Sequence, residues 1–170
     1  MLSVPPDASC DLLIIAGEAS GDEHAARLLE DLRESRPDLK VAAIGGPKLR
    51  DAGADLLFDL TRHAVVGIFE VLKNYGFFKK LMSDTLDWIG KVKPQAVLFV
   101  DYPGFNLRIA KFLKTHNIPV LYYISPQIWA WKESRIHQIK RDVTKMYTIL
   151  PFEKAFYKKF EVDVNFVGHP

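Results

Sequence analysis

The sequence has little cysteine, no long apolar run and no strong excess of charge. Cys10 is the only cysteine, which excludes an intramolecular disulfide and fits a reducing compartment. No uncharged apolar run approaches the ~18 residues that a membrane-spanning helix needs. The stretch 1–11 lacks the basic region of a signal peptide and contains acids, so we expect a cytoplasmic protein.

Charge balance and length set further limits. The 23 Lys and Arg residues nearly balance the 21 Asp and Glu residues, and 48% of the chain is hydrophobic. This composition predicts a folded domain and no nucleic-acid partner. At 170 residues, the chain can form one well-buried domain and is too short for two ordinary ones.

What is present is an alternation of short apolar runs with segments of helical spacing. The alternation predicts an α/β fold built on a doubly wound parallel sheet. We expect helices between the strands, among them one ending near Arg33 and others at 48–52, 105–116 and 151–160. The expected strands are 12–16, 41–44, 55–58, 96–100, 118–124, 143–150 and 164–167.

Asp101 directly follows the apolar run Ala96–Val100 and precedes a Tyr-Pro-Gly turn. A continuous apolar run of this kind is typical of a strand buried on both faces of a parallel sheet. Ligands of open α/β sheets bind at the carboxyl ends of the strands, which favours a functional role for Asp101. The alternative is that Asp101 caps the helix that begins near Gly104.

A turn with two glycines, GEASGD at 17–22, follows the first expected strand. Glycines allow close approach of the backbone to a ligand, and the N–H groups at a helix start can bind an anion or a hydroxyl. The spacing matches neither G-x-G-x-x-G nor a P-loop. A tight turn capped by Ser20 or Asp22 is the structural alternative.

Two later stretches are ambiguous. Residues 64–82 carry apolar side chains on more than one helical face, flanked by lysines, which fits contact with lipid or a partner, or a core helix between two neighbours. Trp129 and Trp131 follow the strand at 118–124 and suit either a pocket or the core. For the basic helix after Trp131 we favour a solvated face over a binding patch.

Seven motifs occur in an order that resembles the lipid-A-disaccharide synthase family, inverting glycosyltransferases of the GT-B architecture. The resemblance covers 12–170, and it implies a Rossmann-like N-terminal half of such an enzyme. The motifs are GEASGD at 17–22, IGGP at 44–47, VGIFEVL at 66–72, DYPGFN at 101–106, SPQIWAW at 125–131, LPFE at 150–153 and VGHP at 167–170.

The resemblance implies a reaction. The family transfers 2,3-diacylglucosamine from UDP-2,3-diacylglucosamine to 2,3-diacylglucosamine 1-phosphate (lipid X), releasing UDP at the cytoplasmic face of the inner membrane of Gram-negative bacteria. No metal or cofactor is expected. Residues 1–170 would hold the acceptor, and a C-terminal UDP-sugar domain, absent from this chain, would act in cis or in trans. The chain alone is therefore expected to fold but not to turn over.

The resemblance also implies roles for single residues. Asp101 is the expected catalytic base, with Glu18 or His24 as competitors, because an inverting transfer needs a base for the acceptor hydroxyl. Membrane contact is expected from Val66, Ile68, Phe69, Leu72, Phe77 and Phe78. Substrate contact is expected from Gly17, Glu18, Ser20, Gly21, Asp22, Asn106, Ser125, Gln127 and Trp129.

Two other functions are compatible with the same motifs. One is another GT-B half that acts on a different lipid-linked acceptor, such as an undecaprenyl-linked one. The other is a non-catalytic module that binds a lipid headgroup.

Overall fold

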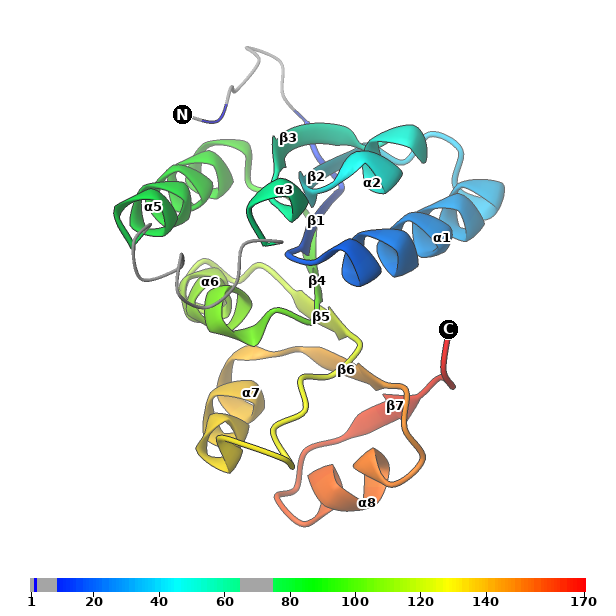
Figure 1. The fold of residues 1–170 in the computed structure, drawn as a ribbon, viewed down its shortest axis with the longest axis vertical. Coiled ribbons are helices and arrows are strands. Elements are labelled where there is room, and N and C mark those ends of the chain that lie inside the picture. The colour runs from blue at the N-terminus through cyan, green and yellow to red at the C-terminus, as the bar shows by residue number, and fades with distance from the viewer. Residues whose placement is uncertain (1, 3–8, 65–74) are drawn as a thin grey trace.

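The computed structural model describes residues 2, 9–64 and 75–170. Seven parallel strands form one sheet in the order β3-β2-β1-β4-β5-β6-β7, which confirms the predicted doubly wound sheet (Figure 1). The strands are β1 (Leu12–Ala16), β2 (Val41–Gly45), β3 (Asp55–Asp59), β4 (Ala96–Val100), β5 (Val120–Tyr123), β6 (Lys145–Thr148) and β7 (Val164–Phe166).

Helices cover both faces of the sheet. The helices α1 and α2 lie on one side, whereas α5, α6 and α7 lie on the other (Figure 1). In the described part of the chain, no helix is long and apolar enough to cross a membrane. The helices are α1 (Ala19–Ser35), α2 (Pro47–Asp51), α3 (Thr61–Ala64), α5 (Tyr75–Val92), α6 (Pro103–Thr115), α7 (Ile136–Asp142) and α8 (Glu153–Lys158), with a 3₁₀ turn at Glu133–Arg135.

The central strands bury alternate side chains in two separate cores. Leu13 and Phe99 belong to the core that also contains buried residues of α5, α6 and α7. Ile14 and Val100 belong to the core that contains buried residues of α1. Burial on both faces is why these strands are continuous apolar runs in the sequence.

The winding of the chain reverses between β1 and β4, which are neighbours in the sheet. Ala16 at the end of β1 is in register with Val100 at the end of β4. From these adjacent ends, the chain continues to α1 on one face and to α6 on the other (Figure 1). Such a reversal opens a crevice at the carboxyl ends of the strands, where open α/β sheets bind ligands.

Helix α5 starts earlier than the sequence pattern indicates, because its first turns contact two neighbours. The Phe77 ring lies 5.7 Å from the ring of Phe58 in β3, centroid to centroid. Phe78 and Met82 line a cavity together with residues of α6. Phe77, Phe78 and Met82 are thus partly buried and pack against the core, and their exposed portions leave room for the predicted contact with lipid. The apolar residues before Tyr75 lie outside the described part.

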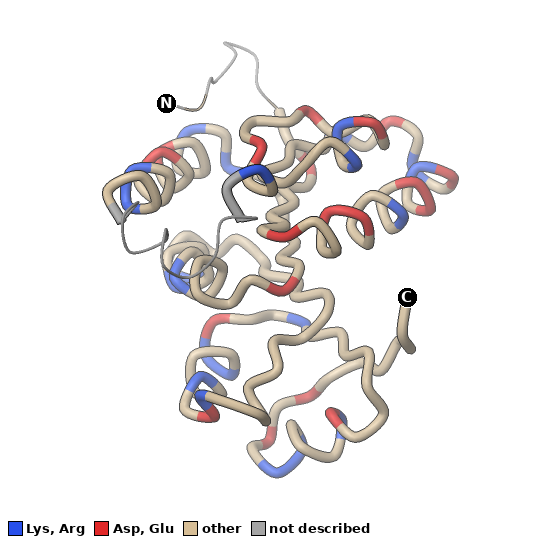
Figure 2. Tube along the Cα trace, in the orientation of Figure 1, with Lys and Arg blue, Asp and Glu red and all other residues tan. Residues whose placement is uncertain are grey.

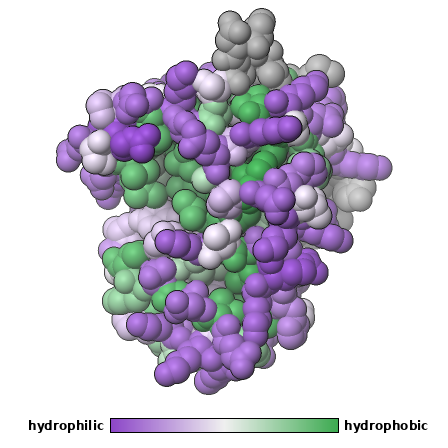
Figure 3. Space-filling view, turned by 180° about the vertical axis from the view of Figure 1, so that it is seen from behind, coloured by the Kyte–Doolittle hydropathy of each residue, from purple (hydrophilic) through white to green (hydrophobic). Residues whose placement is uncertain are grey.

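The surface is mixed in charge. Acidic residues occur where β1 passes into α1 and where β4 passes into α6, whereas α7 carries several basic ones (Figure 2). Seen from behind, polar side chains cover much of the molecule, with hydrophobic side chains visible between them (Figure 3). These two acidic connections lie at the crevice, at the carboxyl ends of β1 and β4.

Candidate active site

Asp101 lies at the end of β4 in an uncommon backbone conformation. Its φ is 45° and that of Tyr102 is 48°, so two consecutive non-glycine residues are left-handed. Side chains hold this turn in place: Asn106 Nδ2 donates to the Asp101 carbonyl at 2.7 Å, and the Tyr122 hydroxyl donates to the same oxygen at 2.6 Å. Backbone strain of this kind persists only where neighbours enforce it, and it concentrates at functional sites.

The capping interpretation of Asp101 is not supported by the start of α6. The helix begins at Pro103, and its N-cap residue is Tyr102, without a side-chain capping hydrogen bond. The Asp101 carboxylate is therefore not used to hold the helix N-terminus. It remains available for chemistry in the crevice.

The environment of Asp101 suits a base. The pKa of its carboxyl group is raised to about 6: burial contributes most and the nearby Glu18 carboxylate adds to it, whereas a hydrogen bond from the Tyr102 N–H acts in the opposite direction. At neutral pH the carboxylate is mostly ionised, yet more basic than an ordinary Asp. A pKa near the working pH is what general-base catalysis requires.

Asp101 lines a cavity of about 310 Å³ at the end of the sheet. Of the predicted substrate-binding residues, only Gln127 shares this lining. Trp131, which suited either a pocket or the core, lies in this lining, and so does Arg135, which was not predicted to. The basic helix was expected to be a solvated face, but Arg135, just before α7, lies at the cavity instead. The full lining is Asp101, Pro103, Pro126, Gln127, Ile128, Trp131 and Arg135.

Gly17 makes room for the turn that carries Asp101. A Cβ atom at Gly17 would lie 2.3 Å from Cγ of the Tyr102 ring, so a larger residue would displace that ring. Gly21, in contrast, would place a Cβ no closer than 3.5 Å to Val100. The first glycine of the GEASGD turn is thus required by a contact between the two crevice loops.

Replacing Gly17 with alanine should therefore destabilise the fold by about 1–3 kcal/mol, the usual range for overpacking. Gly104→Ala is a matched control, because a Cβ there meets nothing within 4 Å. Urea unfolding of both variants measures the difference. Equal stability would contradict the close contact between Gly17 and Tyr102.

Asp22 has a structural role that differs from the predicted contact with substrate. Its side chain is only 2% exposed. Its carboxylate accepts N–H groups of Gly46 at 2.8 Å, Lys48 at 2.9 Å and Leu49 at 3.3 Å. Asp22 therefore caps α2 from the neighbouring helix, and neither Asp22 nor Ser20 caps α1, whose N-cap residue is Glu18.

Asn106 and Ser125 are also buried, and their hydrogen bonds hold the loops of the site in place. Asn106 is fully buried and holds the Asp101 carbonyl. Ser125 is 4% exposed and donates to the buried Glu153 carboxylate, which also accepts the N–H of Leu150 at 2.9 Å. Their burial favours positioning of the crevice loops over the direct substrate contact that was predicted.

The remaining predicted residues do not line the Asp101 cavity. Glu18 and Ser20 are exposed at the start of α1. Trp129 is 37% exposed and packs edge-to-face on Phe152 at 5.0 Å, centroid to centroid, so it is neither core nor part of the Asp101 lining. His24, the other competitor for the base, has an Nδ1 that is buried without a hydrogen-bond partner in the described part of the chain.

The residues predicted to contact a membrane are only partly described. Val66, Ile68, Phe69 and Leu72 lie outside the described residues. Phe77 and Phe78 are half-buried and pack against the core. Phe78 also lines a cavity of about 410 Å³ between α5 and α6 that includes Tyr102, Phe105 and the two cations Lys79 and Arg108.

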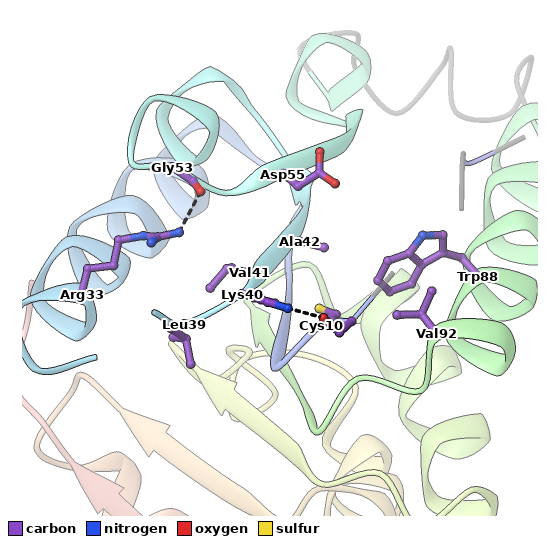
Figure 4. Close-up of a pocket in the computed structure, with 11 residues that line it drawn as sticks. Cys10, Arg33, Leu39, Lys40, Val41, Ala42, Gly53, Asp55, Trp88 and Val92 are labelled. Atoms are coloured by element: carbon purple, nitrogen blue, oxygen red, sulfur yellow. Dashed lines mark hydrogen bonds between the residues drawn. The ribbon is translucent and has the colours of Figure 1, made fainter. Parts of the chain in front are cut away.

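A further cavity of about 440 Å³ lies at the opposite end of the sheet (Figure 4). Two of its polar groups bond within the chain: Lys40 Nζ donates to Ser9 Oγ at 2.6 Å, and Arg33 Nη2 donates to the Gly53 carbonyl at 2.8 Å. Burial raises the pKa of the Cys10 thiol there. Because this cavity adjoins the amino ends of β1 and β2, it is separate from the Asp101 crevice. Within residues 9–64 and 75–170, no cluster of His, Cys, Asp or Glu is arranged to hold a metal ion.

Solved structures share this architecture. A crystal structure of UDP-GlcNAc 2-epimerase from Neisseria meningitidis matches with a TM-score of 0.63 and 13% identity, over 93% of this chain and 45% of that chain. A crystal structure of Acinetobacter baumannii MurG matches with a TM-score of 0.54 and 13% identity, over 94% and 46%. The fold is thus a Rossmann-like α/β domain with a carboxylate at the reversal of the strand order.

The family model of lipid-A-disaccharide synthetase matches residues 12–170, so the chain belongs to this family. A lipid-A-disaccharide synthase 1 of Legionella pneumophila is 49% identical over 166 residues, which are 97% of this chain and 43% of the relative. Lipid-A-disaccharide synthases of Nitrosococcus oceani and Coxiella burnetii are 48% and 44% identical, over 92% and 94% of this chain and 41% and 42% of the relatives. The chain spans less than half the length of these curated relatives.

Proposed function

We propose that this chain is the acceptor-binding half of a lipid-A-disaccharide synthase. The complete enzyme transfers 2,3-diacylglucosamine from UDP-2,3-diacylglucosamine to the 6-hydroxyl of lipid X. Asp101 removes the hydroxyl proton while the oxygen attacks the anomeric carbon in line, and UDP leaves with the bonding electrons. The observation that carries this proposal is a carboxylate with a pKa of about 6 in a cavity at the reversal of the sheet.

The cavity between α5 and α6 supports a lipid acceptor. It adjoins the Asp101 turn through Tyr102, and its lining combines Phe78, Met82 and Phe105 with the cations Lys79 and Arg108. Acyl chains would fill the apolar part, and the cations would face anionic headgroups of the membrane surface. We propose peripheral association with the cytoplasmic face of the inner membrane on this side of the molecule.

A second domain that holds the UDP-sugar completes the proposed enzyme. To test this, residues 12–170 are joined to the C-terminal portion of the Nitrosococcus oceani relative, and UDP release is measured with lipid X as acceptor. The chimera should release UDP and form disaccharide, whereas this chain alone should not. A chimera that folds and binds UDP but forms no product would contradict the proposal. Product only from a peptidoglycan precursor would indicate the other GT-B function.

A further inference from the structure

Arg135 is the one cationic side chain in the lining of the Asp101 cavity. It is half-buried, whereas its neighbours Lys132 and His137 are exposed. In the described part of the chain, six of the other arginines bond to an acidic side chain or a carbonyl oxygen, and Arg108 is exposed. Arg135 alone combines partial burial, a place in a cavity and a guanidinium with no hydrogen bond or ion pair among the described residues.

The backbone fixes the position of Arg135. Lys132 has a left-handed φ of 59° and starts the 3₁₀ turn, in which the Arg135 N–H donates to the Lys132 carbonyl at 2.9 Å. The next helix, α7, is anchored in the core by Ile136 and Ile139, which are 2% and 1% exposed. A guanidinium held on rigid elements loses little freedom when it binds an anion.

Asp101 and Arg135 occupy the same cavity without pairing. No hydrogen bond or ion pair joins them among the described residues, and Arg135 is not among the groups that shift the pKa of Asp101. The cavity therefore presents a base at one point and an unpaired cation at another, with space for a ligand between them.

We propose that Arg135 binds a phosphate group of the acceptor sugar whose attacking hydroxyl lies at Asp101. This inference rests on the proposed function. A phosphate carries close to two negative charges at neutral pH and accepts paired hydrogen bonds from a guanidinium. Trp131, 75% exposed on the same lining, offers an aromatic face to the sugar ring between the two ends.

The test titrates this chain with N-acetylglucosamine 1-phosphate and with neutral N-acetylglucosamine, following the indole NMR signals. Wild type should bind the phosphorylated sugar more tightly. Arg135→Gln should weaken that binding by about 10- to 100-fold, while binding of the neutral sugar stays unchanged. Arg135→Lys should retain part of the preference. Lys132→Gln is the matched control, since Lys132 is an exposed cation of the same turn that does not line the cavity.

The outcomes separate the two proposals. A phosphate preference that persists in Arg135→Gln, or is lost equally in Lys132→Gln, overturns the assignment of Arg135 and leaves the proposed function standing. If wild type does not prefer the phosphorylated sugar, the assignment is likewise overturned. Wild type that binds neither sugar overturns both. Thermal unfolding of each variant shows that the fold is intact.

Discussion

Asp101→Asn in the active chimera should lower the rate of UDP release by about 100- to 10,000-fold, the range for loss of a general base. The amide keeps the shape of the carboxylate but cannot accept the proton of the acceptor hydroxyl. The wild-type rate should rise with pH through a midpoint near 6 and level off above it, because the ionised form is active. An Asp101→Asn or Asp101→Ala variant with full rate would show that the base lies elsewhere.

Glu18 provides the matched control for this prediction. Its carboxylate raises the pKa of Asp101, so Glu18→Gln should move the midpoint of the pH profile to lower pH while most of the maximal rate is retained. If Glu18 is itself the base, the loss in Glu18→Gln would match that in Asp101→Asn. The same comparison with His24→Gln tests the remaining competitor.

Asp101→Asn should also stabilise the isolated chain at neutral pH. The folded pKa of Asp101, about 6, lies above the ordinary value of 3.8 for an aspartate, so folding favours the protonated form. Its contribution to stability is fully present below about pH 4 and is lost as the pH rises through 6. Asp101→Asn should then be more stable than wild type at pH 8, by about 1–2 kcal/mol after allowance for partial exposure, and similar at pH 4. A catalytic loss accompanied by lower stability would instead indicate a damaged fold.

Asp22→Ala should cause the largest loss of stability, about 3 kcal/mol in urea unfolding. The substitution leaves the N–H groups of Gly46, Lys48 and Leu49 without their acceptor, and buried donors are costly when unpaired. It also removes the cap of α2, a helix too short to be stable by itself.

Controls distinguish this cap from a general charge effect. Glu30→Ala removes an exposed carboxylate from the same helix and should change stability by less than about 0.5 kcal/mol. Asp22→Asn keeps one acceptor oxygen and should lie between the two. If Asp22→Ala is no worse than Glu30→Ala, the carboxylate does not hold α2.

The strand pattern was predictable because it depends on local hydrophobic runs. The expected strands 12–16 and 96–100 match β1 and β4, and Asp101 follows the second of them as predicted. The expected strand 143–150 was too long, since only Lys145–Thr148 forms strand β6, between β5 and β7. The flanking Val143 packs against the core, and hydrophobic periodicity cannot separate such packing from strand pairing.

The site was only partly predictable, because its residues come from distant parts of the chain. The sequence by itself determined that Asp101 directly follows a buried strand and that a turn with glycines follows another. Apolar runs and turn residues act locally, so both features can be recognised without the tertiary structure. Only the tertiary structure decided that Arg135 and Trp131 line the Asp101 cavity, and that the Asp22 carboxylate caps the N-terminus of α2. Those contacts depend on strand order and on side-chain burial, and neither is encoded in the spacing of residues along the chain.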